Sequence, residues 1–210
     1  MDNKFRVPRV WSNRELKKFA ELFRGRIVNV SGGTDSDKED SDYKSYFTAK
    51  TEYFISNYQL NNPLKENEFY LDLEQEIPQK YQGAFDVVFN HTTLEHVYDC
   101  KMAFSGLCKL SSGVVICVVP YIQQMHGNVY KDYWRFTPWT MKKMYEENGF
   151  NLRYCVANGG DLASIYLFCI GYRGNDWDSL IPAKFDLALD PNKPLYSDDY
   201  RNVIGGNVIL

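Results

Sequence analysis

The stretch "FDVVFNHTTLEHVYDCKMAFSGLCKLSSGVVICVVP", residues 85–120, decides the fold. It opens on a short apolar run at 85–90 and closes on a second, β-branched run at 114–120, so both ends have the pattern of a buried strand. Residues 99–110 between them have the period of a helix, with an expected inward face of Met102, Ala103, Leu107 and Leu110. Two apolar strands joined by an amphipathic helix are the building unit of a parallel α/β sheet.

The same alternation continues on both sides of this unit. Residues 11–25 are expected to form a helix with Ser12 as its N-cap, and a second helix is expected after Thr137, where Pro138 takes the first helical position and Gly149 the stop. Further strands are expected at 26–30, 52–58, 68–73, 150–157 and 163–172.

These segments predict one α/β domain over residues 1–171, with a mostly parallel seven-stranded sheet, an antiparallel last strand and helices on both faces. Residues 172–210 have a thinner, polar pattern and are expected to be an extension that packs on the domain or forms an oligomer contact. A homodimer is therefore one of the expected states of the protein.

The overall composition excludes several classes of partner. The 210 residues carry 24 basic and 27 acidic side chains, a net charge of −3, so no large positive field attracts nucleic acid or an anionic membrane. The five cysteines form no CxxC pair, and Cys117 and Cys169 lie in apolar runs, as buried reduced thiols do. The first residues lack an apolar signal core, and no run reaches the roughly 18 apolar residues of a membrane span. We expect a soluble, cytoplasmic protein.

The loop "NVSGGTDSDKEDSD", residues 29–42, follows the first expected strand. Its glycine pair, Gly32 and Gly33, would let the backbone approach a ligand at the carboxyl end of that strand. Neither GxGxxG nor GxxxxGKT is present, which disfavours nicotinamide and ATP. The acidic run does not fit a calcium loop, because Asp40 stands where glycine is needed and Tyr46 where a bidentate Glu is needed. We interpret this run as a solvated surface loop.

Five segments stand in an order and at a spacing that suggest a known family: "IVNVSGGTD", "FYLDLEQEIP", "FDVVFNHTTLEHVYD", "GVVICVVPY" and "HGNVYKDYWRFTPWTMKKMYEENGF". Together they resemble class I S-adenosylmethionine-dependent methyltransferases, in particular the branch common in bacterial surface-glycan gene clusters. The last segment, residues 126–150, is similar to the "HG…DYWRFT" signature of that branch and is the most specific match. The resemblance covers roughly residues 20 to 171.

The resemblance implies a Rossmann-like methyltransferase domain that binds S-adenosyl-L-methionine and transfers its methyl group. The acceptor it implies is a small molecule or glycan, O-methylated on a sugar or sugar-linked group in surface-glycan biosynthesis. It places the cofactor against Asn29, Ser31, Gly32, Gly33, Asn57, Asp72, Leu73 and Asn90. The acceptor side would be lined by Tyr133, Trp134 and Arg135, with Arg135 holding an anionic group through its planar fork. In the alternative interpretation, Trp134, Phe136 and Trp139 form a hydrophobic plug.

The three histidines are candidates for the base that a hydroxyl acceptor needs. His126 and His91 follow the fifth and fourth expected strands, so we expect the catalytic base among these two. His96 is expected to be a bonded, half-buried imidazole, and Glu95 either orients an imidazole or caps the next turn. No Cys/His set has zinc spacing, so no metal is expected.

Four positions depart from the family pattern. Asn29 stands for the acid that ends the first strand, Ser31 and Asp35 replace glycines of the cofactor loop, and Asn57 replaces the acid that grips the ribose. A carboxylate would accept both ribose hydroxyl protons with charge assistance, whereas an amide offers one acceptor oxygen. A catalytically degenerate protein that uses the fold as a binding or assembly module is therefore the main alternative. An epimerase or reductase is disfavoured by the missing dinucleotide fingerprint.

Overall fold

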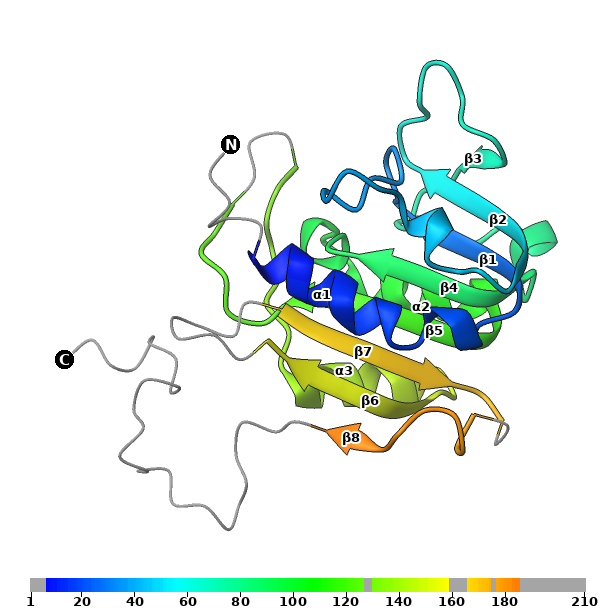
Figure 1. Ribbon diagram of the computed structural model, residues 1–210. Helices are drawn as coiled ribbons and strands as arrows, with labels where there is room; N and C mark the ends of the chain where they lie inside the picture. The colour runs from blue at the N-terminus through cyan, green and yellow to red at the C-terminus, as the bar shows by residue number, and fades with distance from the viewer. Residues whose placement is uncertain (1–6, 127–129, 159–165, 175–176, 186–210) are drawn as a thin grey trace, which may run out of the picture.

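One sheet of eight strands forms the centre of the protein (Figure 1). A computed structural model describes residues 7–126, 130–158, 166–174 and 177–185. The strands are β1 (Gly25–Val30), β2 (Lys50–Asn57), β3 (Glu68–Tyr70), β4 (Phe85–His91), β5 (Ser111–Pro120), β6 (Asn151–Ala157), β7 (Tyr166–Tyr172) and β8 (Lys184–Phe185). Their order in the sheet is β3-β2-β1-β4-β5-β7-β6-β8. Only β7 runs antiparallel to its two neighbours, β5 and β6, and every other pairing is parallel.

The predicted mostly parallel sheet is confirmed, but the predicted count of seven strands is wrong. The antiparallel strand is β7, the last of the strands predicted from the sequence, whereas the last strand of the structure, β8, is parallel to β6. The eighth strand, β8, pairs with β6 and comes from the extension at 172–210. Two residues are too few to show a period of two, so the sequence pattern does not reveal this strand. The first residues of the segment expected at 163–172 and residues 186–210 lie outside the described parts of the chain.

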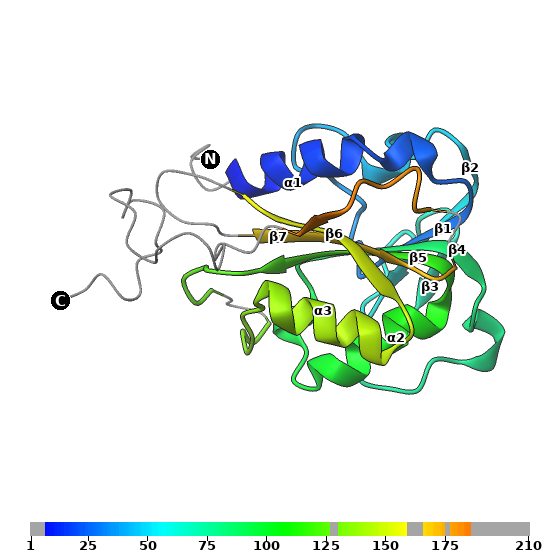
Figure 2. The same cartoon turned by 90° about the horizontal axis from the view of Figure 1, so that it is seen from below.

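Three helices cover both faces of the sheet, as expected: α1 (Val7–Lys17) on one face, and α2 (Cys100–Leu110) and α3 (Pro138–Glu147) on the other (Figure 2). Asp99 caps α2 by accepting from the Met102 backbone N–H, and the Thr137 side chain caps α3 by accepting from Thr140. Both faces of the central strands are therefore buried, which explains their near-continuous apolar sequences.

Two helix details differ from the prediction. The first helix begins at Val7 instead of residue 11, and Ser12 lies inside it with its hydroxyl donating to the Arg9 carbonyl. The local signal misleads because serine can satisfy its hydroxyl inside a helix by bonding back one turn. Met102 is 38% exposed, so its assignment to the inward face is wrong, whereas the neighbouring Phe104 is buried.

No α-helix connects β1 to β2, and an irregular segment, residues 31–49, covers that part of the sheet instead. Its aromatic side chains Tyr43, Tyr46 and Phe47 are buried in the core on the α1 side. The interpretation of its acidic run as solvated is wrong for Asp35 and Asp37. Asp37 accepts from the Tyr46 hydroxyl at 2.6 Å, and burial raises the pKa of Asp35. These carboxylates organise the segment because buried acceptors must be paired.

The described part of the extension packs on the domain, and the cysteines are buried. Trp177 packs against Phe23 with 5.6 Å between ring centroids, and Ile181 is buried, so residues 177–185 lie on the domain. All five cysteines are free and buried, as expected for reduced thiols. Among the described residues, no helix has the length and apolar character that crossing a membrane requires.

Candidate functional site

The carboxyl ends of β1, β2 and β4 meet at one edge of the sheet. The chain passes from β1 to β2 and β3 on one side and from β4 to β5 on the other, so β1 and β4 flank the point where the strand order reverses, the usual ligand site of such sheets. A cavity of about 540 Å³ lies there, within the usual size range of small-molecule sites. Its lining comes from the ends of β1, β2, β3 and β4 and from Tyr130 on the segment after β5: Ser31, Gly33, Asn57, Tyr58, Gln59, Leu71, Asp72, Leu73, Glu74, Thr92, Thr93, His96, Val97 and Tyr130.

The turn after β1 presents its backbone to this cavity. Ser31 and Gly33 both have φ of 57°, a conformation that glycine adopts at no steric cost. A Cβ added to Gly33 would meet no atom within 4 Å, so this residue faces open space. A Cβ on Gly32 would lie 2.7 Å from the Asn29 side chain, so Gly32 is needed for packing. Ser31 and Gly33, two of the residues predicted to contact the cofactor, therefore line the cavity. Gly32, a third, lines only an adjoining hollow.

Three asparagines assigned to cofactor contacts each form hydrogen bonds within the protein. Asn57 lines the cavity, but its Oδ1 accepts from the Gly33 N–H at 2.7 Å and its Nδ2 donates to the Gly33 carbonyl at 3.0 Å. Asn29 donates to Asp35 at 2.7 Å, and Asn90 donates to the Val30 carbonyl at 2.9 Å and lines neither hollow. The amides thus position the turn after β1, and Asp72 and Leu73 are the predicted residues that line the cavity opposite it.

Replacing Asn57 by aspartate is expected to destabilise the protein. In Asn57→Asp a carboxylate oxygen would face the Gly33 carbonyl and the Glu68 carboxylate, to which Nδ2 now donates at 2.7 Å. We expect the free energy of unfolding, measured in urea, to fall by about 2–4 kcal/mol, because a buried donor is replaced by a charge facing acceptors. Asn61 donates to the same two groups at a more exposed position, so Asn61→Asp is the matched control with a smaller loss. Equal stability of Asn57→Asp and the parent protein would contradict this role.

A second, polar hollow of about 200 Å³ adjoins the first and shares Ser31, Gly33, Thr92 and Thr93 with it. Arg9 and Lys38 bring positive charge to its wall. The Arg9 guanidinium donates to the Tyr43 hydroxyl and to Thr92 Oγ1, both at 3.1 Å, which fixes its direction. The hollow therefore suits a small anionic group such as a carboxylate. Sequence reasoning missed Arg9, because α1 lies outside the segments that carry the resemblance.

His91, one of the two expected bases, lines the second hollow and is buried. Its Nε2 lies 2.8 Å from Ser12 Oγ and its Nδ1 lies 3.2 Å from Thr92 Oγ1. Burial lowers the pKa of His91 well below its usual value, so the ring is neutral at pH 7 and a weak proton acceptor. The bond to Ser12 gives His91 a structural role, because it joins the end of β4 to α1.

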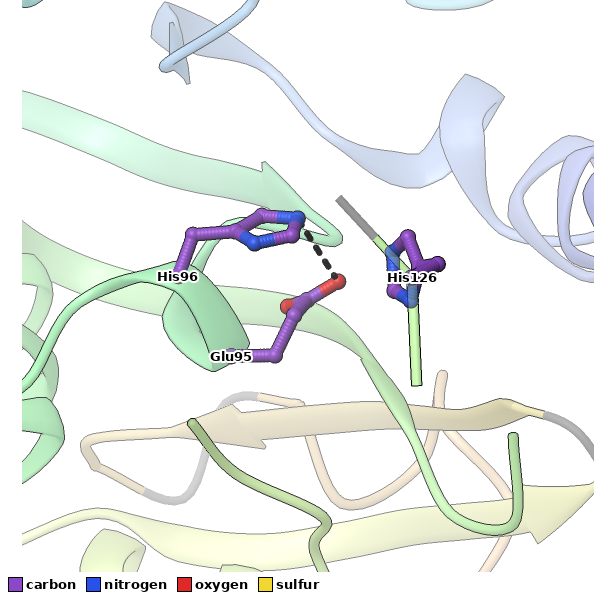
Figure 3. A group of neighbouring side chains, drawn as sticks. All are labelled: Glu95, His96 and His126. Atoms are coloured by element: carbon purple, nitrogen blue, oxygen red, sulfur yellow. Dashed lines mark ion pairs between the residues drawn. The ribbon is translucent and has the colours of Figure 1, made fainter. Parts of the chain in front are cut away.

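His126, the other expected base, lies next to His96 and Glu95 at the edge of the larger cavity (Figure 3). Glu95 and His96 belong to the short helical turn η5 (Leu94–His96) after β4, and His126 lies on the segment after β5. The His96 and His126 ring centroids are 5.2 Å apart. Burial raises the pKa of Glu95 to about 8. His96 is bonded and half-buried, as expected, but it also lines the cavity, which the sequence analysis did not predict.

Arg135 is engaged within its own loop. Its guanidinium donates to both oxygens of Asp132, at 2.6 and 2.7 Å, and to the carbonyls of Gln123, Gln124 and Trp134. Asp132 therefore occupies the fork that the sequence analysis assigned to an anionic acceptor. Residues 127–129 of the same signature lie outside the described parts of the chain.

The aromatic residues of the signature divide between core and surface. Phe136 is buried, whereas Trp139 is exposed, so the plug involves Phe136 alone. Trp134 donates through Nε1 to the carbonyls of Val97 and Tyr98 at 3.0 Å, and the Tyr133 backbone N–H donates to the Glu95 carbonyl at 2.7 Å. Tyr133 and Trp134 thus attach the signature to η5 and to the two residues after it, and among the described residues of this segment Tyr130 lines the cavity.

The Asp132–Arg135 pair predicts a specific pH dependence. Hydrogen bonding to Arg135 lowers the pKa of Asp132 from 3.8 to about 2, so the pair stabilises the fold fully above pH 4 and is lost as pH falls through about 2. Asp132→Asn is expected to lower the free energy of unfolding by about 2–4 kcal/mol at pH 7. The difference from the parent should shrink by about half at pH 3. Asp40→Asn, at an exposed position, controls for the lost charge. A difference that does not change with pH would contradict the assignment.

No family model matches this chain, and no curated protein matches it. Solved structures do match its fold. An S-adenosylmethionine-dependent methyltransferase of Aquifex aeolicus superposes with a TM-score of 0.57 at 16% identity over 80% of this chain and 92% of that one. The 1,6-didemethyltoxoflavin-N1-methyltransferase of Burkholderia thailandensis, solved with S-adenosylhomocysteine, gives 0.56 at 13% identity over 80% and 79%.

A Rhodobacter sphaeroides structure described under Zn-dependent alcohol dehydrogenases also matches, with a TM-score of 0.59 at 13% identity over 77% of this chain and 89% of that one. At such low identity these likenesses show the fold alone. The chain has the Rossmann-like α/β fold found in S-adenosylmethionine-dependent methyltransferases, with eight strands in its sheet.

Proposed function

We propose that this protein is an S-adenosylmethionine-dependent methyltransferase that acts on a hydroxyl oxygen. The observation that carries the proposal is the cavity at the switch point between β1 and β4, where Gly33 turns its backbone toward open space. A ligand that lies against the strand ends needs this close backbone approach. The resemblance of the five sequence segments and the shared fold point to the same cofactor.

The two hollows match the two ends of this cofactor. The larger cavity offers Leu71 and Leu73 to an apolar ring face and Asp72 to its polar edges, which fits adenosine. The smaller hollow brings the Arg9 guanidinium beside Thr92, which fits the methionine carboxylate. Because the hollows share Ser31, Gly33, Thr92 and Thr93, the sulfur would lie at their junction.

In this methyl transfer the main task of the protein is to position the acceptor oxygen against the methyl carbon. S-adenosylmethionine supplies a methyl carbon whose bond to sulfur breaks, with the electron pair staying on sulfur, as the acceptor oxygen bonds to that carbon. The strand-end turns hold the reacting groups in line, which provides most of the acceleration in such a reaction. The hydroxyl proton would leave at the cavity edge that His96 lines, where Glu95 and His126 lie beside it.

The acceptor we propose is a sugar or a sugar-linked group, within surface-glycan biosynthesis. This part rests on the resemblance of residues 126–150 to the signature of that branch. The signature segment lies beside the cavity, since Tyr130 lines it and Tyr133 is bonded to η5. A small glycan acceptor would approach the cofactor between these residues and His96.

A calorimetric titration with S-adenosylhomocysteine tests the cofactor. We expect binding in the micromolar range, and titration with NAD⁺ under the same conditions should give none, since the dinucleotide fingerprint is missing. Absence of S-adenosylhomocysteine binding at millimolar ligand would instead favour a degenerate binding module. The observation behind that alternative is that Asn57, which stands in place of the ribose-binding acid, forms hydrogen bonds with the Gly33 backbone through both atoms of its amide.

A further inference from the structure

Glu95, His96 and His126 converge from two loops that are far apart in the sequence. Glu95 and His96 follow β4, His126 follows β5, and the three side chains point toward one another (Figure 3). One potential ligand atom from each residue can be chosen so that all three atoms lie within 4.8 Å of one another. His96 also lines the cavity proposed for the cofactor, so this cluster lies where an acceptor would enter.

Both imidazoles are held from one side by an oxygen atom. His96 Nδ1 lies 2.7 Å from the Lys131 carbonyl, and a carbonyl only accepts, so in the neutral ring Nδ1 carries the proton and Nε2 has a lone pair. That Nε2 lies 3.8 Å from Glu95 Oε1. His126 Nδ1 lies 3.1 Å from Asp132 Oδ2, and Asp132 is in turn fixed by Arg135. Histidines that bind metals are typically oriented in this way, by a carbonyl or a carboxylate on the far nitrogen.

Glu95 supplies the independent observation. It is completely buried, and neither of its carboxylate oxygens has a hydrogen-bond partner among the described residues. A buried carboxyl group whose oxygens have no hydrogen-bond partner destabilises the fold even when it is protonated, so native proteins retain one only where something compensates it. The His96 ring offers Glu95 only a lone pair at 3.8 Å, which does not satisfy an acceptor. A cation between the three side chains would satisfy all of them.

We propose that Glu95, His96 and His126 bind one divalent transition-metal ion of the Zn²⁺ type. Two imidazole nitrogens and one carboxylate form the ligand set of catalytic sites that leave coordination positions open. In a tetrahedral site with bonds of about 2.1 Å the ligand atoms are about 3.4 Å apart, so separations of up to 4.8 Å must shorten by up to about 1.4 Å. His126 is on the partly exposed side of the cluster and has room for that movement. The expectation of no metal arose because sequence spacing detects only ligands that are close in the chain.

The role we assign to the ion rests on the proposed methyl transfer. An acceptor hydroxyl would take an open coordination position, and the ion would lower its pKa. The hydroxyl proton passes to solvent on the open side, the oxygen bonds to the methyl carbon, and the carbon–sulfur electron pair stays on sulfur. A substrate with two neighbouring oxygens, such as a sugar diol, would occupy two positions and fix the direction of attack. This narrows the acceptor class to chelating hydroxyl compounds.

Metal binding is tested on the full chain after treatment with a chelator. Titration with Zn²⁺ should show one ion per chain and a higher melting temperature, and Co²⁺ should give the visible absorption of a bound low-symmetry ion. Glu95→Gln, which keeps the side-chain shape, His96→Ala and His126→Ala should each weaken Zn²⁺ binding by about 100-fold or more, beyond the 10- to 100-fold typical of outer partners. Glu74→Gln, elsewhere on the cavity wall, is the matched control and should bind as the parent does.

Parallel titrations with S-adenosylhomocysteine in chelator separate this proposal from the proposed function. Stoichiometric Zn²⁺ binding without S-adenosylhomocysteine binding would support the metal site and overturn the methyltransferase. S-adenosylhomocysteine binding without stoichiometric Zn²⁺ binding would overturn the metal site alone. Unchanged Zn²⁺ affinity in folded Glu95→Gln, His96→Ala and His126→Ala would also overturn it, since the ion would then be bound elsewhere.

Discussion

Replacing Gly33 by leucine is expected to raise the dissociation constant of S-adenosylhomocysteine by about 100-fold or more. Gly33 has φ of 57°, and a side chain there would extend into the open space shared by the two hollows. The new side chain occupies the volume of the ligand and blocks its approach to the backbone. The left-handed conformation adds a strain of about 1–2 kcal/mol for a residue with a Cβ.

Gly83→Leu separates these two effects. Gly83 has φ of 62° and, like Gly33, no atom within 4 Å of a Cβ, but it precedes β4 at the opposite edge of the sheet. Its leucine variant should show the same loss in melting temperature and normal ligand binding in calorimetry. If Gly33→Leu is folded and binds S-adenosylhomocysteine as tightly as Gly83→Leu does, the cofactor does not lie at this turn.

Replacing Arg9 by alanine should weaken S-adenosylhomocysteine binding by about 10- to 100-fold, the value of a hydrogen bond to a charged group. Arg9 is the guanidinium in the smaller hollow, where we place the amino-acid end of the cofactor. The variant also loses the bonds to Tyr43 and Thr92, so a loosened loop could lower affinity for another reason. A second ligand resolves this.

5′-Methylthioadenosine has the adenosine and the sulfur of the cofactor but no amino-acid end. Arg9→Ala should therefore bind this ligand as the parent protein does while losing affinity for S-adenosylhomocysteine. Lys17→Ala, on the same helix and outside both hollows, should bind both ligands normally. Equal losses for the two ligands in Arg9→Ala would show that Arg9 only supports the loop.

Some parts of the site were visible in the sequence because they depend on neighbouring residues. The glycine turn that contains Gly33 and the polar corner that contains Thr92 each follow directly after an apolar run of the sequence. The roles of individual side chains were less predictable. Asn57 and Arg135 stand at positions that the resemblance assigns to ligand contacts, yet each is bonded within the protein, to Gly33 and to Asp132. A motif gives the residue type at a position, whereas its hydrogen-bond partners come from other segments.

By itself, the sequence determined most elements of this fold and their order along the chain. Apolar runs such as 85–90 and 114–120 and the caps Asp99 and Thr137 are local signals, because burial period and backbone capping act within a few residues. Even the antiparallel seventh strand follows from two adjacent apolar segments.

Only the tertiary structure decided which side chains meet. It brought Arg9 of α1 to the end of β4, buried Asp35 and Asp37 under the aromatic side chains of residues 31–49, and added β8 to β6. It also placed His126 beside Glu95 and His96. These contacts join segments far apart in the chain, and their energies come from burial and pairing in three dimensions. Sequence patterns report neighbours along the chain and hold no information about those distances.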